Sequence, residues 1–170
     1  NANYFVGKTV KLGADIDLTG KNLPGSSAAT GVSEGFYGTF DGQFHTISNL
    51  TFSKTYSYQG ALFGAVDSSV LNAEQKAIVE ANGITVKNFS LVDSTVNAGA
   101  RASTLYGWVF ASLTVENVYI NADVTASGDC TGGYIGDAAV GTITFKNCMF
   151  EGTVVNKKAD VGCGAFVGRI

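Results

Sequence analysis

The amino-acid sequence predicts an all-β protein built as a parallel β-solenoid, and three observations predict it. The composition favours strands and turns, because the 170 residues include 22 glycines and one proline while β-branched and aromatic residues are common. A short segment with an asparagine at a fixed point occurs four times along the chain. Apolar residues within each copy alternate with a period of two, as they do in a strand that buries one face.

Length and composition predict one domain with a hydrophobic core, spanning 1–170. Hydrophobic residues make up 45% of the chain, charged residues 15%, and the net charge is −3. No basic face emerges, so nucleic acid is not an expected partner. No apolar run approaches the roughly 20 residues of a membrane span. The sequence lacks an initiator methionine and a signal peptide, and it is interpreted as a fragment of a longer protein.

The first part of the chain is expected to form an atypical N-terminal cap rung, over 1–44, with the repeats following over 45–170. Apolar residues alternate along "TVKLGADIDL" (9–18), which predicts two short strands with a turn near Gly13. A long polar loop is expected over 22–35. Terminal rungs of solenoids are usually irregular because they must cover the end of the core.

Four segments align without gaps and define the repeat. They read "HTISNLTF" (45–52), "ITVKNFSL" (84–91), "LTVENVYI" (113–120) and "ITFKNCMF" (143–150). The alternation changes phase at the asparagine, which predicts a corner, and asparagine tolerates the left-handed backbone that a corner needs. Rungs stacked about 4.8 Å apart bring equivalent residues together. The aligned asparagines are therefore expected to form a structural ladder: Asn49, Asn88, Asn117 and Asn147.

Other equivalent positions predict further columns on the stacked rungs. One outward column is expected to contain Thr46, Thr85, Thr114 and Thr144, and a column beside it Ser48, Lys87, Glu116 and Lys146. A second motif, of the form small-x-apolar-apolar-Gly, follows each asparagine and is expected to supply a third strand. It reads "GALFG" (60–64), "STLYG" (103–107), "GGYIG" (132–136) and "GAFVG" (164–168).

One short helix is predicted near 71–83, where the spacing between repeats is about ten residues longer than elsewhere. Asn72 is a suitable N-cap, Glu74 and Gln75 lie in the first turn, and Gly83 can end the helix. We expect this helix to be inserted between strands and to lie on the outside of the solenoid.

The only histidine, His45, lies four residues after Asp41 in "FYGTFDGQFHTISNL" (36–50). An acid and a base this close are compatible with a catalytic site. The alignment instead places His45 at the position of Ile84, Leu113 and Ile143, which predicts a core column near the capped end. Asp41 and Gly42 are interpreted as the tight turn that leads into the strand.

Enzymatic and metal sites find little support in the residue pattern. One histidine and three scattered cysteines do not form a zinc pattern, and we expect no metal or cofactor. Asp15 and Asp17 alternate as calcium ligands do, but the later glutamate of a calcium loop is missing. A disulfide between Cys130 and Cys163 is left open. A polysaccharide-active β-helix enzyme is the main alternative, with Asp123 and Glu151 as its acid pair.

Exposed aromatic residues are the best binding candidates, because aromatic faces stack on sugars and anchor protein partners. Four of them fall outside the predicted core positions: Tyr56, Tyr58, Trp108 and Tyr119. Ordinary packing over a turn is the competing interpretation.

The order of several motifs resembles that of GLUG-motif proteins. The stretches are "GKTVKLGADIDLTG" (7–20), "FYGTFDGQFHTISNLTFS" (36–53), "GALFGAV" (60–66) and "GGYIGDAAVGTITFKNCMFEGTV" (132–154). Together they extend over most of the chain. The resemblance implies a right-handed parallel β-helix in a bacterial secreted or cell-surface protein, including adhesin-like proteins and non-catalytic regions of immunoglobulin A peptidase-like proteins. The tryptophan of the family's loop is missing here, and the absence of H-E-x-x-H means that no peptidase function carries over.

The sequence therefore predicts a non-catalytic structural or adhesive module located outside the bacterial cell. A glycan or a host surface protein is the expected ligand, and neighbouring domains of the parent protein are further expected partners. A scaffold whose only role is spacing remains an alternative.

Overall fold

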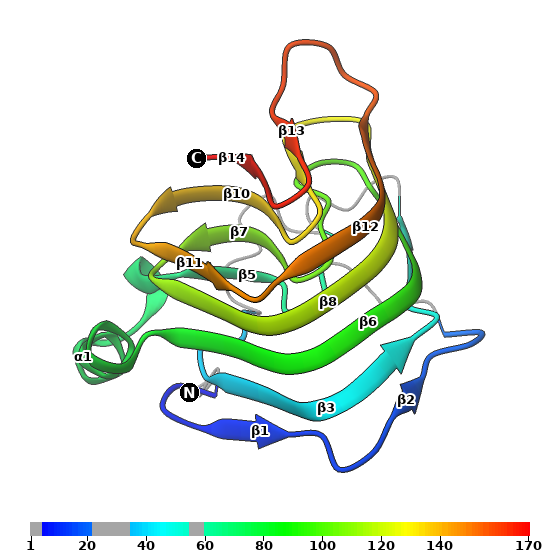
Figure 1. The fold of residues 1–170 in the computed structure, drawn as a ribbon. Helices are drawn as coiled ribbons and strands as arrows, with labels where there is room; N and C mark the ends of the chain where they lie inside the picture. Colours follow the sequence, from blue (N-terminus) through cyan, green and yellow to red (C-terminus); the bar gives the residue numbers. More distant parts are fainter. Residues whose placement is uncertain (1–4, 22–34, 55–59) are drawn as a thin grey trace.

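The protein is a parallel β-solenoid of about five turns, which confirms the predicted fold class. The structure is a computed structural model and describes residues 5–21, 35–54 and 60–170. Successive coils stack so that strands from consecutive turns lie side by side along the solenoid (Figure 1). None of the helices within these ranges is long and apolar enough to cross a membrane.

The largest sheet contains eight strands, all paired in parallel. Five of them follow one another in the order β1 (Thr9–Lys11), β3 (Thr39–Ser48), β6 (Ile84–Ala98), β8 (Leu113–Ala126) and β11 (Ile143–Lys146). The other three extend this sheet beyond its bend: β2 (Ile16–Asp17) pairs with β3, β4 (Thr51–Lys54) with β6, and β12 (Met149–Asn156) with β8. Each long strand therefore contributes to two neighbouring sides of a coil.

Two smaller sheets complete the coils. The second sheet has the order β14 (Val167–Arg169), β10 (Ile135–Val140), β7 (Tyr106–Phe110) and β5 (Ala65–Asp67). The third contains β9 (Thr131–Gly132) and β13 (Cys163–Gly164), and isolated bridges extend it to Ala102 and Gly60. The copies of the predicted small-x-apolar-apolar-Gly motif span the bend between the third and second sheets.

The core lies inside the coils and is filled by the inward residues of all three sheets. In the central coil, Val115, Ile120 and Val124 are each 0% exposed. Tyr134 is also 0% exposed, and its hydroxyl lies 2.7 Å from the carbonyl oxygens of Val118 and Met149, either of which can accept its proton, so the ring is buried without an unsatisfied polar atom. Each fully buried apolar side chain contributes about 1.5–3 kcal/mol to folding.

The predicted inserted helix is present as α1 (Ala73–Asn82), between β5 and β6. A short 3-10 helix, η2 (Ser68–Val70), precedes it. Asn72 and Gln75 form a capping box, in which each side chain accepts a hydrogen bond from the other's backbone N–H. Val79 is the helix residue that is buried, so α1 lies on the outside of the solenoid as expected.

Three of the predicted ladder asparagines are joined by hydrogen bonds at the bend of the large sheet. Asn147 Nδ2 donates to Asn117 Oδ1 over 3.1 Å, and Asn117 Nδ2 donates to Asn88 Oδ1 over 2.9 Å. Asn88, Asn117 and Asn147 have φ values of 57°, 53° and 49°, the left-handed region that asparagine tolerates. The phase change in the sequence therefore marks this corner.

Asn49 is not part of the ladder, and its alignment with Asn88 was wrong. Strand β3 pairs with β6 in a different register, with Thr39 opposite Thr85 and His45 opposite Phe89. Asn49 instead donates from Nδ2 to Asp17 Oδ1 over 2.8 Å. A bulge at Gln43 and Phe44, with φ values of 50° and 63°, shifts the register within β3, and a gapless alignment does not detect such a shift.

Asp41 takes the place of an asparagine at the N-terminal end of the ladder. Its Oδ1 accepts from Asn88 Nδ2 over 3.0 Å, and its carboxylate lies 3.9 Å from Lys87 Nζ. In the corrected register, Thr46 lies opposite Ser90 and leaves the predicted threonine column. That column consists of Thr9, Thr39, Thr85, Thr114 and Thr144. The charged column beside it consists of Lys11, Asp41, Lys87, Glu116 and Lys146.

The middle of the ladder provides a test of both its hydrogen bonds and its backbone conformation. We expect Asn117→Ala to lower the free energy of unfolding by about 2–4 kcal/mol, because two hydrogen bonds are lost and alanine is placed at a positive φ. Asn117→Gly loses the same hydrogen bonds without the backbone strain, so we expect a loss smaller by about 1 kcal/mol. Denaturant unfolding followed by circular dichroism measures both losses, and equal losses would contradict the backbone contribution.

The N-terminal end of the ladder predicts a pH dependence of stability. Burial alone would raise the pKa of Asp41, but hydrogen bonds from Asn88 and the Gln43 N–H, and the charges of Lys87 and Lys11, lower it overall. A carboxyl whose pKa is lowered by folding contributes stability above its unfolded pKa, and this contribution is lost as the pH falls through the folded pKa.

We therefore expect the wild type to exceed Asp41→Asn in free energy of unfolding at pH 7. The difference should shrink once the pH falls below about 4, the usual pKa of an aspartate. Denaturant unfolding of both proteins across this range measures it, and a difference that stays constant with pH would contradict the assignment.

Candidate functional site

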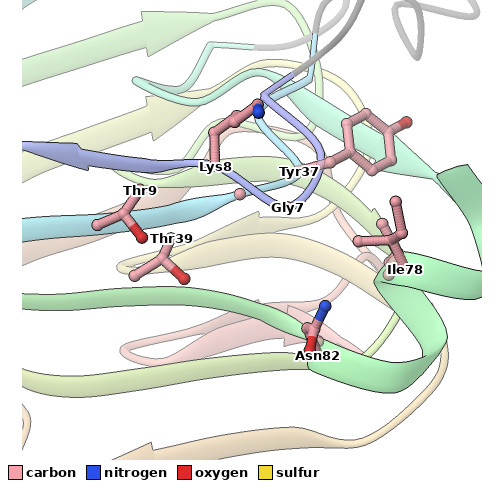
Figure 2. A pocket seen from close by; sticks show the side chains of 10 residues that line it. Gly7, Lys8, Thr9, Tyr37, Thr39, Ile78 and Asn82 are labelled. Carbon is pink, nitrogen blue, oxygen red and sulfur yellow. The ribbon is translucent and has the colours of Figure 1, made fainter.

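A polar pocket of about 290 Å³ lies between α1 and the first coils of the solenoid (Figure 2). The turn over 5–8, the start of β3 and the C-terminal end of α1 form its wall. The residues that line it are Gly7, Lys8, Thr9, Tyr37, Gly38, Thr39, Ile78, Val79, Asn82 and Gly83.

Glycines allow the close packing that forms this wall. A Cβ on Gly38 would lie 2.5 Å from the carbonyl oxygens of Lys8 and Phe5, so no larger residue fits without a backbone shift. Gly7 has a φ of 66°, and a Cβ there would lie 3.1 Å from Ile78 Cγ2 of the helix. The Thr39 N–H donates to the Lys8 carbonyl over 2.8 Å, which fixes the turn over 5–8 against β3.

The side chains around the pocket supply hydroxyl, amide and ammonium groups. Thr9 and Thr39 are paired in register and form the first two positions of the threonine column, while Asn82 lies across from them at the end of α1 (Figure 2). Tyr37 is not available to a ligand through its hydroxyl, which donates to the Asp67 carbonyl and accepts from the Asp67 N–H. The lining residues carry no carboxyl, imidazole or thiol group.

Two further pockets differ from this one in chemistry. One, of about 200 Å³, is lined by apolar residues at the N-terminal end of the core: Leu12, Ile16, Leu18, Phe40, Ile47, Leu62 and Phe63. The other, of about 210 Å³, lies beside the helix and includes Glu80 and Ser112. Neither has two carboxyl groups in its lining.

The structure separates the acid and the base that lie close together in the sequence. His45 Nδ1 lies 3.0 Å from Asp15 Oδ1, whereas Asp41 bonds to Asn88. The predicted placement of His45 in the column of Ile84 was wrong, because His45 lies opposite Phe89 and its side chain is 32% exposed. The expected turn at Asp41 and Gly42 is a bulge inside β3, where Asp41 Oδ1 accepts from the Gln43 N–H.

Asp15 and Asp17, the alternating acids, are both engaged by neighbouring donors. Asp15 accepts from the Thr46 N–H and contacts His45, and these two hydrogen bonds lower the pKa of its carboxyl. Asp17 accepts from Thr19 and Asn49, which lowers the pKa of Asp17 in the same way. These acids therefore fasten the first coil to β3.

The two acids of the enzymatic alternative lie on the outer face of the large sheet. Asp123 lies opposite Thr153, and its Oδ1 accepts from the Thr153 N–H and hydroxyl over 3.1 and 2.6 Å. Glu151 lies opposite Asn121 and accepts a hydrogen bond from the Tyr119 hydroxyl. That hydrogen bond raises the pKa of Tyr119. Neither acid lines any of the three pockets described above.

The predicted aromatic residues do not gather into one site among the residues that the structure describes. The Arg101 guanidinium lies 4.5 Å from the Trp108 ring centroid, and Phe110 contacts the ring edge-on, so part of the indole surface is already in contact. Tyr119 is half-buried on the outer face of β8. Tyr56 and Tyr58 lie outside the described residues.

A network of two arginines and two aspartates, which the sequence did not reveal, lies beside Trp108. Arg101 Nε is 3.2 Å and Arg169 Nη2 is 2.5 Å from Asp137 Oδ2. Both arginines also contact Asp129, over 3.3 and 3.2 Å. A signal existed in the motifs, because Asp137 and Arg169 each follow the last glycine of a small-x-apolar-apolar-Gly copy and lie opposite each other in register.

Cys130 joins Asp129 and Asp137 in a group whose ligand atoms lie within 4.8 Å of one another. The two arginines occupy the carboxylates, so a cation would have to displace them. Burial, and then the nearby Asp137 and Asp129, raise the pKa of the Cys130 thiol to about 11. The thiol is therefore protonated at neutral pH, which disfavours both metal binding and nucleophilic attack. Cys130 and Cys163 are free thiols in this structure.

Comparison with known proteins supports the fold and no more than the fold. No family model matches the chain, and no curated protein matches it at a significant level. The chain is similar to a crystal structure described as "a putative immunoglobulin A1 protease from Bacteroides ovatus", with a TM-score of 0.59 and 19% sequence identity. The match covers 96% of this chain and 56% of that one, so the chain spans about half the length of the solved structure.

The network of arginines and aspartates predicts that the buried carboxylate of Asp137 contributes strongly to the stability of the fold. Asp137 has a side chain that is 5% exposed and Arg101 one that is 10% exposed. We expect Asp137→Asn to lower the free energy of unfolding by about 3–5 kcal/mol, because it removes a charge partner of a buried arginine. Arg169 is 48% exposed, so Arg169→Gln should cost about 1 kcal/mol or less. Urea unfolding compares the two variants, and a larger effect of Arg169→Gln would contradict this interpretation.

Proposed function

We propose that this chain is a non-catalytic adhesive module of a bacterial cell-surface or secreted protein, and that it binds a glycan in the pocket beside α1. The similarity to a Bacteroides ovatus protein supports a bacterial context. The resemblance to GLUG-motif proteins supports a location at the cell surface or outside the cell. The observation that carries the binding proposal is the lining of the pocket, which combines polar donors and acceptors with no acid–base pair.

The chemistry of the lining suits a hydroxyl-rich ligand. Threonine hydroxyls donate and accept, the Asn82 amide does both through separate atoms, and the Lys8 ammonium donates. Sugar hydroxyls need the same mixture of partners. The aliphatic side chain of Ile78 faces the pocket beside Gly7 and offers an apolar contact for the C–H groups of a sugar ring (Figure 2). A small number of oriented polar groups around an apolar contact is typical of small-molecule sites.

Lys8 extends this chemistry to anionic sugars. The lining residues include one lysine and no aspartate or glutamate. The Lys8 ammonium points away from Thr39 and Asn82 in Figure 2, and the side chain is exposed, so it would turn towards a carboxylate on the ligand. We therefore favour acidic glycans over neutral ones, with binding that weakens as the salt concentration rises.

The binding proposal predicts a specific pattern among threonine variants. A glycan array that includes uronic-acid oligosaccharides identifies the probe, and calorimetry then measures its Kd. We expect Thr39→Val and Asn82→Ala each to weaken binding about tenfold, because each removes roughly one net hydrogen bond. Thr144→Val is the matched control, since Thr144 lies in the same column at the far end of the sheet. Equal losses in Thr39→Val and Thr144→Val, or no array signal, would refute a site in this pocket.

The enzymatic alternative is tested on the same ligands. Release of reducing ends or of unsaturated products from any bound polysaccharide, abolished by Asp123→Asn or Glu151→Gln, would overturn the non-catalytic proposal. Asp123 and Glu151 lie outside the pocket, so these variants leave the binding measurement itself unaffected.

A further inference from the structure

The most exposed aromatic side chain among the described residues is one that the sequence pattern did not mark as a binding candidate. Phe44 is 76% exposed, whereas Trp108 and Tyr119 are half-buried. Phe44 belongs to the bulge of β3, where three residues separate Asp41 from His45 while one residue separates the paired positions of β6. A bulge redirects side chains, and this one directs the Phe44 ring into solvent at the bend of the large sheet.

The backbone that presents Phe44 is unfavourable for this residue type. Gln43 and Phe44 have φ values of 50° and 63°, a left-handed region that bulky side chains rarely adopt. The bulge is nevertheless fixed, because the Gln43 N–H donates to Asp41 Oδ1 over 3.0 Å. Gly42 packs so closely that a Cβ there would lie 2.3 Å from Phe89 Cβ. The fold therefore retains a strained and exposed aromatic residue, a combination that is found at binding sites.

Phe44 lies on the same strand as the polar pocket, a short distance further along. Thr39, at the start of β3, lines the pocket. The residues of β6 that pair with Thr39 and His45 are four positions apart, so Phe44 lies about 10–13 Å from Thr39 along the strand. The outer surface between them carries Asp41 and, in the paired strand β1, Lys11. The pocket and the exposed ring are thus two ends of one continuous surface.

The charges along this surface suit an acidic oligosaccharide. Lys11 and Lys87 lie on either side of Asp41 in the charged column. The Asp41 carboxylate already accepts hydrogen bonds from Asn88 and from the Gln43 N–H. Two ammonium groups therefore accompany one engaged carboxylate, and the net positive charge attracts carboxylates of a ligand.

We propose that the glycan site extends from the pocket along β3 to Phe44, and that its ligand is an acidic oligosaccharide of about three or more sugar units. This inference rests on the proposed glycan-binding function and specifies the length of the ligand. One sugar ring covers about two residues of a strand, so a monosaccharide in the pocket does not reach Phe44 whereas the third unit of a chain does. That unit stacks its C–H face on the Phe44 ring, and carboxylates of the preceding units meet Lys11 and Lys87.

A size series of one acidic glycan measures the extent of the site. Calorimetry with galacturonic acid and its oligomers, from the dimer to the hexamer, gives a Kd for each length. We expect the Kd to fall steeply up to the trimer or tetramer and to change little beyond it. Phe44→Ala should weaken binding of the tetramer about tenfold, the effect of losing one stacked ring, and leave the Kd of the dimer unchanged.

Met149→Ala is the matched control for the loss of an exposed apolar side chain. Met149 is 53% exposed and begins β12, which belongs to the same sheet but does not border the pocket. We expect this variant to bind every member of the series as the wild type does. A loss of tetramer binding equal to that of Phe44→Ala would overturn the assignment of Phe44.

A stability measurement separates a binding role of Phe44 from a structural one. Phe44→Asn removes the ring and places at the same φ a residue that tolerates it. We expect the midpoint of urea unfolding to rise, while tetramer binding weakens as it does in Phe44→Ala. A lower midpoint would show that the ring is retained for packing, and would overturn the proposal.

The outcomes of the size series distinguish this inference from the function on which it rests. A Kd that is independent of length, or tetramer binding that survives Phe44→Ala, would overturn the extended site and leave the pocket as the whole glycan site. The second result would favour a protein partner as the contact for Phe44. Absence of binding to every member of the series would overturn the acidic-glycan proposal itself, and this inference with it.

Discussion

The hydrogen bond between Asp41 and Asn88 is the interaction on which the order of the solenoid depends. A carboxylate at the start of the ladder removes the ambiguity of the asparagine amides, because only one orientation lets every later rung both donate and accept. The ladder holds the left-handed corners, and those corners bend the large sheet. The bend in turn directs the apolar residues on both sides of it towards one core. One charged residue thus gives the whole stack a direction.

The part of the fold that the sequence predicts well is the part that repeats without insertion. From Ile84 onward, consecutive coils keep the same register through β6, β8, β11 and β12, apart from one shift near Asp93, so period-two alternation and the asparagine column were enough. The coil that contains β3 could not be aligned with the later coils from the sequence pattern alone. The bulge at Gln43 and Phe44 displaces the second half of β3, and "HTISNLTF" imitates the repeat while it lies at a different corner. Similar sequence segments do not determine the strand register when one of the strands contains inserted residues.

The candidate site could not be predicted because its residues meet through stacking and not through sequence proximity. Lys8 and Asn82 line one pocket although more than seventy positions separate them. The ion network likewise joins Arg101 to Asp137 and Arg169, one from each of three coils. The aromatic residues were predicted to bind a ligand from their residue type and not from their surroundings. In the structure the Trp108 ring is already in contact with the Arg101 guanidinium. A residue's availability depends on its neighbours in adjacent coils, which only the register reveals.

The inserted helix α1 also explains why a pocket forms where it does. A regular coil presents a flat outer face, on which equivalent side chains stack and satisfy one another, as Asp123 and Thr153 do. The inserted α1 breaks this regularity between β5 and β6 and projects beside the start of the threonine column. Thr9 and Thr39 thereby line a pocket that residues of the helix bound on one side. Positions where a sequence departs from its own repeat are expected to include functional sites. In this chain the insertion that lengthens one coil also creates a concave surface of the kind that a small ligand requires.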